Sequence, residues 1–131
     1  MRAIGATAVI ACVLVLAACG PSESDMKARG MTERYYQLIQ QGQFAEAARF
    51  HPEKDRALAE DTLRQHLEKL GVLQSFQISA EEQNTVYSGK FYIYTVDTSY
   101  ERGHASELLT LKTWVSANDS LSIVSHQIDA D

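Results

Sequence analysis

The run TVYSGKFYIYTVDTSY, residues 85–100, decides the fold that this sequence predicts. Aromatic and β-branched residues dominate it, and both types favour the extended, half-buried positions of a sheet. Gly89 is its one glycine and marks a bend or a bulge. We therefore expect residues 85–100 to form a long strand with further strands beside it.

Three more strands are predicted, over residues 72–79, 105–115 and 121–128. In each, apolar residues recur at alternate positions, which is the period of a strand with one buried face. Short polar stretches, predicted as turns, separate the strands at residues 80–84, 101–104 and 117–120. Because turns of this length join antiparallel neighbours, the four strands should form an antiparallel meander.

Three helices are predicted before the sheet, over residues 26–41, 44–50 and 52–70. In the third, Leu63, Leu67 and Leu70 lie on one helical stripe, and Gly71 ends it. Pro52 separates the second helix from the third. A helical layer must cover one face of the sheet, so we expect an α+β fold with three N-terminal helices packed on a four-stranded antiparallel meander.

This order of elements resembles the cone-shaped α+β fold of the nuclear transport factor two-like superfamily, whose broad shape is cystatin-like. The residues that carry the resemblance are the helix at 31–41, the turn at 42–44, the helix end at 67–71 and the long strand ending near Asp97. Enzymes of this superfamily use an acid or a His inside the cone, often with a Tyr that hydrogen-bonds an oxyanion. A helix-covered meander of another type is the alternative.

The N-terminus carries a second resemblance. Arg2, an apolar run over residues 3–15 and then small residues are typical of a secretory signal, and the run is short for a membrane span. The sequence LAAC, residues 16–19, resembles the lipobox of bacterial lipoproteins. The resemblance implies cleavage before Cys19, a diacylglyceryl group on its Sγ, and acylation of the new amine. A soluble secreted protein cut nearby and an uncut anchor helix are the alternatives.

These features divide the chain into a signal peptide (1–18), a lipidated Cys with a linker (19–25) and one domain (26–131). By resemblance to enterobacterial sorting, Gly20 rather than Asp after the Cys implies release to the outer membrane, with the domain facing the periplasm. Cys12 leaves with the signal peptide and Cys19 is modified, so no disulfide is expected in the mature domain.

The chain is acidic, with a formal net charge of −5. Loss of Arg2 leaves 11 basic residues against 17 acidic ones, a net charge of −6. An acidic domain is a poor partner for nucleic acid or for anionic lipid. We expect no nucleic-acid partner, and we expect membrane attachment through the lipid on Cys19.

No catalytic motif is present. His51, His66, His104 and His126 are too scattered to predict a metal site, and no cofactor is expected. His126 shares a predicted strand face with Val124 and Ile128, which indicates partial burial. Tyr92, Tyr94, Asp97 and His126 could converge inside a cone. Strand parity places Asp97 opposite the two tyrosines, however, so we expect no catalytic residue and no enzyme activity.

A binding surface is the main functional expectation. We predict an aromatic and polar face on one side of the sheet, formed by Tyr92, Tyr94, Tyr100, Lys112 and Trp114. If the helices cover that face, Phe91, Ile93, Leu109 and Leu111 should be exposed instead.

Two functions follow. The first is a lipid-anchored periplasmic binding or adaptor domain without catalysis, which engages a protein partner in the cell envelope, for example as an immunity or inhibitor lipoprotein. The alternative is a cone-shaped pocket for a small apolar ligand with isomerase- or hydrolase-like chemistry. An apolar cavity holding a buried carboxylate or His favours the second, and an open aromatic patch over a filled core favours the first.

Overall fold

The computed structural model describes residues 22–130, so the predicted signal peptide and Cys19 lie outside the described residues. The elements in chain order are α1 (Glu23–Gln40), α2 (Phe44–Ala48), η1 (Glu53–Asp55), α3 (Arg56–Leu70), β1 (Leu73–Val86), β2 (Gly89–Tyr100), β3 (Gly103–Trp114), η2 (Val115–Ala117) and β4 (Ser120–Ala130). All four strands lie in one antiparallel sheet in the order β1-β2-β3-β4. The predicted α+β class and the meander are therefore confirmed.

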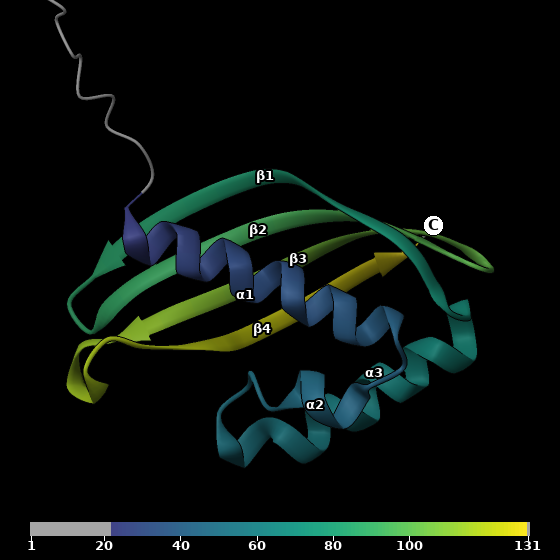
Figure 1. Ribbon diagram of the computed structural model, residues 1–131, viewed down its shortest axis with the longest axis horizontal. Coiled ribbons are helices and arrows are strands. Elements are labelled where there is room, and N and C mark those ends of the chain that lie inside the picture. Colours follow the sequence, from purple (N-terminus) through teal and green to yellow (C-terminus); the bar gives the residue numbers. More distant parts are fainter. Residues whose placement is uncertain (1–21, 131) are drawn as a thin grey trace, which may run out of the picture.

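The helical layer differs from the prediction. Figure 1 shows α1 lying across the curved sheet, with α2 and α3 grouped beside its C-terminal end. α2 has only five residues, and Leu63 is the only fully buried residue that α3 contributes. The expectation of three N-terminal helices packed on the sheet is thus met only in part, because α1 forms most of the cover.

α1 begins earlier than predicted. Ser22 caps it: its Oγ accepts a hydrogen bond from the Asp25 backbone N–H, and the Asp25 carboxylate accepts one from the Ser22 N–H, each over 3.2 Å. This reciprocal pair is a capping box, which satisfies two backbone donors at the helix start. Residues 23–25, predicted as linker, are therefore helical.

The first strand is longer than predicted. Residues 80–84, expected to form a polar turn, continue β1 past a register shift between Ile78 and Ala80, and the connection to β2 is instead Tyr87-Ser88. β1 is an edge strand, paired on one side only. Charged side chains are common on edge strands, so the acidic run that indicated a turn is compatible with a strand.

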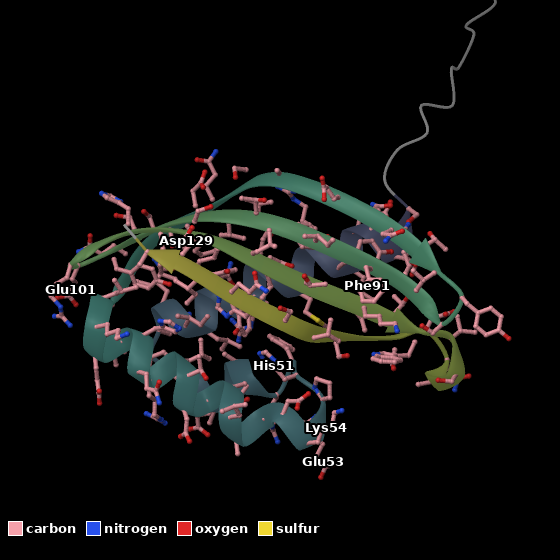
Figure 2. The ribbon with its side chains drawn as sticks, turned by 180° about the vertical axis from the view of Figure 1, so that it is seen from behind. His51, Glu53, Lys54, Phe91, Glu101 and Asp129 are labelled. Carbon is pink, nitrogen blue, oxygen red and sulfur yellow. The ribbon has the colours of Figure 1, made fainter. Side chains whose placement is uncertain are left out.

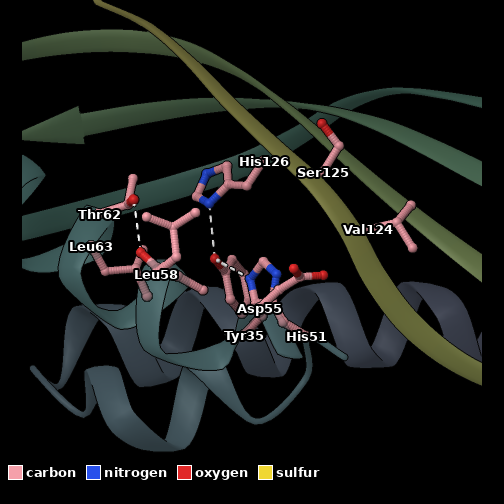
Figure 3. A pocket seen from close by; sticks show the side chains of 10 residues that line it. Tyr35, His51, Asp55, Leu58, Thr62, Leu63, Val124, Ser125 and His126 are labelled. Atoms are coloured by element: carbon pink, nitrogen blue, oxygen red, sulfur yellow. Dashed lines mark hydrogen bonds between the residues drawn. The ribbon is translucent and has the colours of Figure 1, made fainter. Parts of the chain in front are cut away.

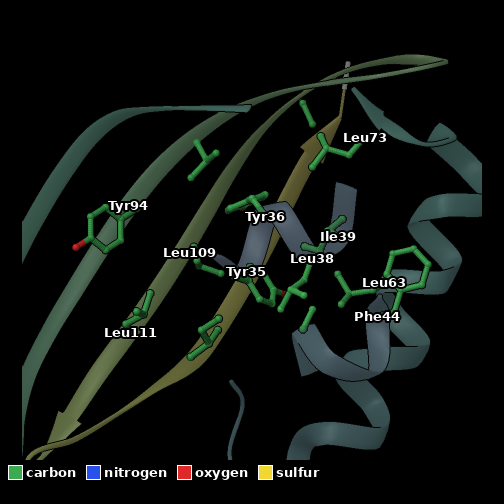
Figure 4. Close-up of a cluster of buried hydrophobic side chains, with 14 of the residues drawn as sticks. Tyr35, Tyr36, Leu38, Ile39, Phe44, Leu63, Leu73, Tyr94, Leu109 and Leu111 are labelled. Carbon is green, nitrogen blue, oxygen red and sulfur yellow. The ribbon is translucent and has the colours of Figure 1, made fainter. Parts of the chain in front are cut away.

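The core lies between α1 and the concave face of the sheet (Figure 4). Tyr35, Tyr36, Tyr94, Leu109 and Leu111 are fully buried there. The cross-strand partners Tyr94 and Leu109 both point toward α1, as do Tyr92 and Leu111. The covered face of β2 and β3 therefore carries aromatic residues on one strand against leucines on the next.

Hydrogen bonds from Arg102 hold the C-terminal end of α3. The Arg102 guanidinium, in the β2–β3 turn, donates to the backbone carbonyls of Leu67, Glu68 and Lys69 at 3.4, 2.6 and 3.2 Å. The Arg102 backbone N–H also donates to the Leu70 carbonyl at 2.8 Å. The Gly71 N–H also donates to the Leu67 carbonyl at 2.8 Å, and Arg102 provides partners for the three carbonyls that follow, which the end of a helix leaves open.

Candidate functional site

The predicted aromatic face is divided between the two sides of the sheet. Tyr92, Tyr94 and Tyr100 are buried beneath the helices, whereas Lys112 and Trp114 belong to the opposite face. The reason is the two-residue turn Glu101-Arg102, which pairs Tyr100 with Gly103 and so places Phe91 across from Lys112. The prediction of one continuous face formed by all five residues is wrong.

The alternative, that Phe91, Ile93, Leu109 and Leu111 are exposed, is also wrong, although the side of the sheet is as expected for the first two. Phe91 and Ile93 point away from the helices and are half-buried, but Leu109 and Leu111 are fully buried on the covered side. Figure 2 shows the sheet from behind, with Phe91 on this outer side. The Lys112 ammonium lies 3.8 Å from the centre of the Trp114 ring and 4.9 Å from that of Phe91. These cation–π contacts and a 2.7 Å hydrogen bond to Ser88 Oγ fill the space around Lys112.

A polar network that the sequence analysis missed lies inside the covered layer, centred on Glu107. This side chain is 1% exposed. Its Oε1 accepts from His126 Nε2 at 2.6 Å and from the Tyr36 hydroxyl at 3.1 Å, and its Oε2 accepts from the Tyr100 hydroxyl at 2.5 Å. A buried carboxylate requires compensation of this kind, because desolvation strongly disfavours its charge.

The network fixes the proton on His126. Burial raises the pKa of Glu107, but the hydrogen bond and positive charge of His126 lower it, as do hydrogen bonds from Thr98 and Tyr100, and the net pKa is below the usual value. Glu107 is then an ionised acceptor, and His126 Nε2 must donate to it. In the neutral tautomer, His126 Nδ1 is left as an acceptor.

Tyr35 continues the network from His126 to His51. Its hydroxyl lies 2.8 Å from His126 Nδ1 and 3.4 Å from His51 Nε2. A Tyr hydroxyl both donates and accepts, so Tyr35 can donate to the Nδ1 of a neutral His126 while it accepts from His51 Nε2. Burial raises the pKa of Tyr35 far above its usual value, which keeps the phenol neutral. We call Glu107, His126, Tyr35 and His51 the buried relay.

The relay meets a pocket of about 280 Å³ between the helices and β4. In Figure 3, Tyr35, His51 and His126 project toward one another at its wall. Apolar side chains supply much of the remaining wall: Leu58, Ala59, Leu63 and Val124. Asp55, Thr62 and Ser125 also line it. This is a concave, mostly apolar space with a few convergent polar groups, which is typical of small-molecule sites.

His51 is neutral at physiological pH. Burial and, to a smaller extent, the charge of His126 lower its pKa to about 4, although Asp55 opposes both effects. His66 is on α3 outside this pocket, and His104 is exposed. The four histidines thus divide into two in the relay and two outside it.

Strand parity could have revealed part of this site. Glu107 alternates with Ala105, Leu109 and Leu111, so a charge occupies an otherwise apolar strand face. The predicted partial burial of His126 is correct, although Val124 lies at a register shift. Asp97 is exposed, away from the tyrosines, as parity predicted.

Among residues 22–130, no group of His, Cys, Asp and Glu side chains is arranged to hold a metal ion. Within the same residues, every helix is too short or too polar to cross a membrane.

Comparisons with known proteins show the fold alone. A solved structure of a protein from Catenulispora acidiphila is similar, with a TM-score of 0.57 and 16% sequence identity over 81% of this chain and 90% of that chain. No protein-family model matches the chain, and no curated protein matches it.

Proposed function

We propose that the protein is a lipid-anchored domain of the bacterial envelope that binds a small, uncharged organic ligand in the pocket beside the buried relay. The observation that carries the proposal is the convergence of Tyr35, His51 and His126 on one apolar pocket. The residues predicted to form an open aromatic patch are mostly buried instead. An apolar cavity that holds a buried carboxylate or His is the feature expected of a ligand site, so this arrangement favours a ligand pocket.

The lining indicates the ligand class. A volume of about 280 Å³ suits a molecule the size of a substituted benzene ring, at the small end of ligand sites. Leu58, Leu63 and Val124 would contact an apolar body. A hydroxyl or carbonyl group would exchange hydrogen bonds with His51 or Tyr35. Because His51 is neutral and Asp55 lies at the wall, an anionic ligand is disfavoured.

We propose binding without catalysis as the primary role. Both ring nitrogens of His126 and both oxygens of Glu107 already have protein partners. One observation favours the alternative of isomerase-like chemistry: the path from His51 through Tyr35 to His126 can pass a proton when each hydrogen bond reverses its direction. A substrate at His51 would then exchange a proton with the relay.

The first test uses p-cresol, a neutral apolar ring with one hydroxyl, in an NMR titration. We expect saturable shifts for residues lining the pocket. Ala59→Trp, which fills the pocket, should abolish them. Leu108→Trp, on the exposed outer face of the sheet, is the matched control and should leave them unchanged. Binding that survives Ala59→Trp would place the ligand elsewhere and refute the proposal.

The anchor is the second part of the proposal. We infer cleavage before Cys19, lipidation of that residue, and residence on the outer membrane facing the periplasm; the lipobox-like LAAC sequence supports this. Intact-mass spectrometry of protein purified from bacterial membranes tests it. The expected mass lacks residues 1–18 and includes acyl chains, and a free thiol at Cys19 would refute the anchor.

We also propose that the fold is the cone-shaped type of the nuclear transport factor two-like superfamily. A curved four-stranded meander with one helix across its concave face, and a pocket at the helix–sheet junction, support it. An experimental structure with p-cresol bound inside the cone would test this assignment together with the pocket.

A protein partner is the second candidate function. It is favoured by the outer face of the sheet, where Phe91 lies away from the helices (Figure 2) and joins Lys112 and Trp114 in the cation–π cluster. Cross-linking in intact cells should capture this partner. A Trp114→Ala variant should lose it, whereas Ala59→Trp should keep it. Equal capture by both variants would remove the support from this face.

A further inference from the structure

The structure points to a membrane-contact rim at one end of the domain. We infer that the end carrying Tyr87 and Val115 lies in the headgroup region of the bilayer to which the proposed Cys19 lipid attaches the chain. This inference rests on the anchor in the proposed function. It adds an orientation, which fixes where the ligand pocket lies relative to the membrane.

Three parts of the chain meet at this end: the start of one helix and two connections between strands. The start of α1 lies beside the β1–β2 turn and the β3–β4 connection, at the left of Figure 1. Lys90 Nζ at the start of β2 contacts Asp25 Oδ1 on α1 at 3.2 Å. The Val115 backbone N–H donates to the Ser88 carbonyl at 3.1 Å. We call Tyr87, Val86 and Val115, with the connections that carry them, the rim.

The rim carries three exposed apolar side chains. Tyr87 is 104% exposed, Val115 is 63% exposed and Val86 is 37% exposed. Folding gains nothing from an aromatic ring left fully in water at the tip of a hairpin. Tyr is well suited to the interface of a bilayer, where the ring meets acyl chains and the hydroxyl meets water.

The short covalent distance to the proposed anchor keeps this end of the domain close to the bilayer. Only three residue steps separate Cys19 from Ser22, the first described residue. Three steps span at most about 11 Å, since consecutive Cα atoms are about 3.8 Å apart. The start of α1 is therefore held within that distance of the lipidated residue, and the rim is its immediate neighbour.

The charges at this end indicate which lipid chemistry fits. Lys90 is paired with Asp25, and the Lys112 ammonium is engaged by Ser88 and two aromatic rings. Asp119, in the β3–β4 connection, is exposed. The rim thus offers no surplus positive charge to anionic headgroups. We expect contact with zwitterionic lipid, through Tyr87 and Val115, and little dependence on salt concentration.

The test uses the full lipidated protein in vesicles made of equal parts phosphatidylethanolamine and phosphatidylcholine. After maturation Cys12 is removed and Cys19 is acylated, so Tyr87→Cys provides a single thiol for an environment-sensitive fluorophore. His104→Cys is the matched control, because His104 is also exposed but lies near the start of β3, at the opposite end of the sheet. Circular dichroism checks that both variants are folded.

The Tyr87 probe should shift to shorter emission wavelengths and be quenched by lipids spin-labelled near the headgroup, whereas the His104 probe should not. Adding Val115→Asp should reduce the quenching at position 87. If the protein binds vesicles but both probes behave as solvent-exposed, the proposed membrane contact of the rim is refuted, while the proposed lipidation of Cys19 stands. Protein that lacks acyl chains by mass and does not co-float with vesicles would instead refute the anchor, and the rim with it.

Discussion

Replacing Glu107 by Gln tests whether an ionised carboxylate organises the interior. The substitution keeps the shape of the side chain but removes the charge that accepts hydrogen bonds from His126, Tyr36 and Tyr100. A hydrogen bond to a charged group contributes about 1.5–3 kcal/mol, against about 0.5–1.5 kcal/mol for a neutral one. Losing about 1 kcal/mol at each of three bonds predicts destabilisation of about 3 kcal/mol.

The assay is urea unfolding followed by far-ultraviolet circular dichroism. The midpoint should fall while the slope with denaturant stays constant, because the surface exposed on unfolding is unchanged. Glu82→Gln, at an exposed position of β1, is the matched control and should change stability by less than about 0.5 kcal/mol.

Glu107→Leu should cost more, because it leaves three buried donors without an acceptor at about 1–3 kcal/mol each. That sum approaches the whole stability of a small domain. If Glu107→Gln were as stable as the unaltered protein, Glu107 would not be the ionised centre of the relay, and the assignment of the His126 tautomer would fail with it.

Three further predictions concern pH, glycine and the relay. The pKa of His51 is depressed from 6.5 to about 4, so its contribution is complete above pH 6.5 and declines as the pH falls toward 4. The loss should reach about 3 kcal/mol, and thermal melts of His51→Gln across this range should show a flatter pH dependence. Gly30→Ala should stabilise α1 by up to about 1 kcal/mol, because a methyl group there meets open space. Gly89→Ala should strongly destabilise the domain, because its Cβ would lie 1.7 Å from the Thr113 carbonyl oxygen. The melting temperature should therefore rise for the first variant and fall sharply for the second. Tyr35→Phe should cost about 1–3 kcal/mol and abolish p-cresol binding, measured by urea unfolding and NMR titration, and undiminished affinity would exclude Tyr35 from recognition.

The sequence predicted the class and order of the fold because those depend on local signals. The alternation in residues 105–115 and the leucine stripe of residues 56–70 arise from short-range periodicity, and both elements are present. The error at residues 80–84 arose because acidic residues are as compatible with an edge strand as with a turn. Only the pairing with β2 distinguishes the two.

The site was harder to predict because its parts are distant in sequence. Tyr35 and His126 are 91 residues apart, and no spacing rule links a helix to the last strand of a sheet. Which face of β2 and β3 is covered depends on the register set by a two-residue turn, and a shift of one residue exchanges the faces. A single inward-pointing carboxylate, Glu107, was the strongest local signal available.

The hydrogen bonds of Arg102 have a consequence for the pocket. They hold α3 at its C-terminal end, whereas the residues of α3 that form the pocket wall lie nearer its other end: Leu58, Ala59 and Thr62. The pocket wall is therefore carried by the part of α3 that lies farther from Arg102, where the Arg56 side chain donates a hydrogen bond to the His51 carbonyl at 3.2 Å. The two ends of α3 are thus held by two separate arginines, and the residues that line the pocket lie between them.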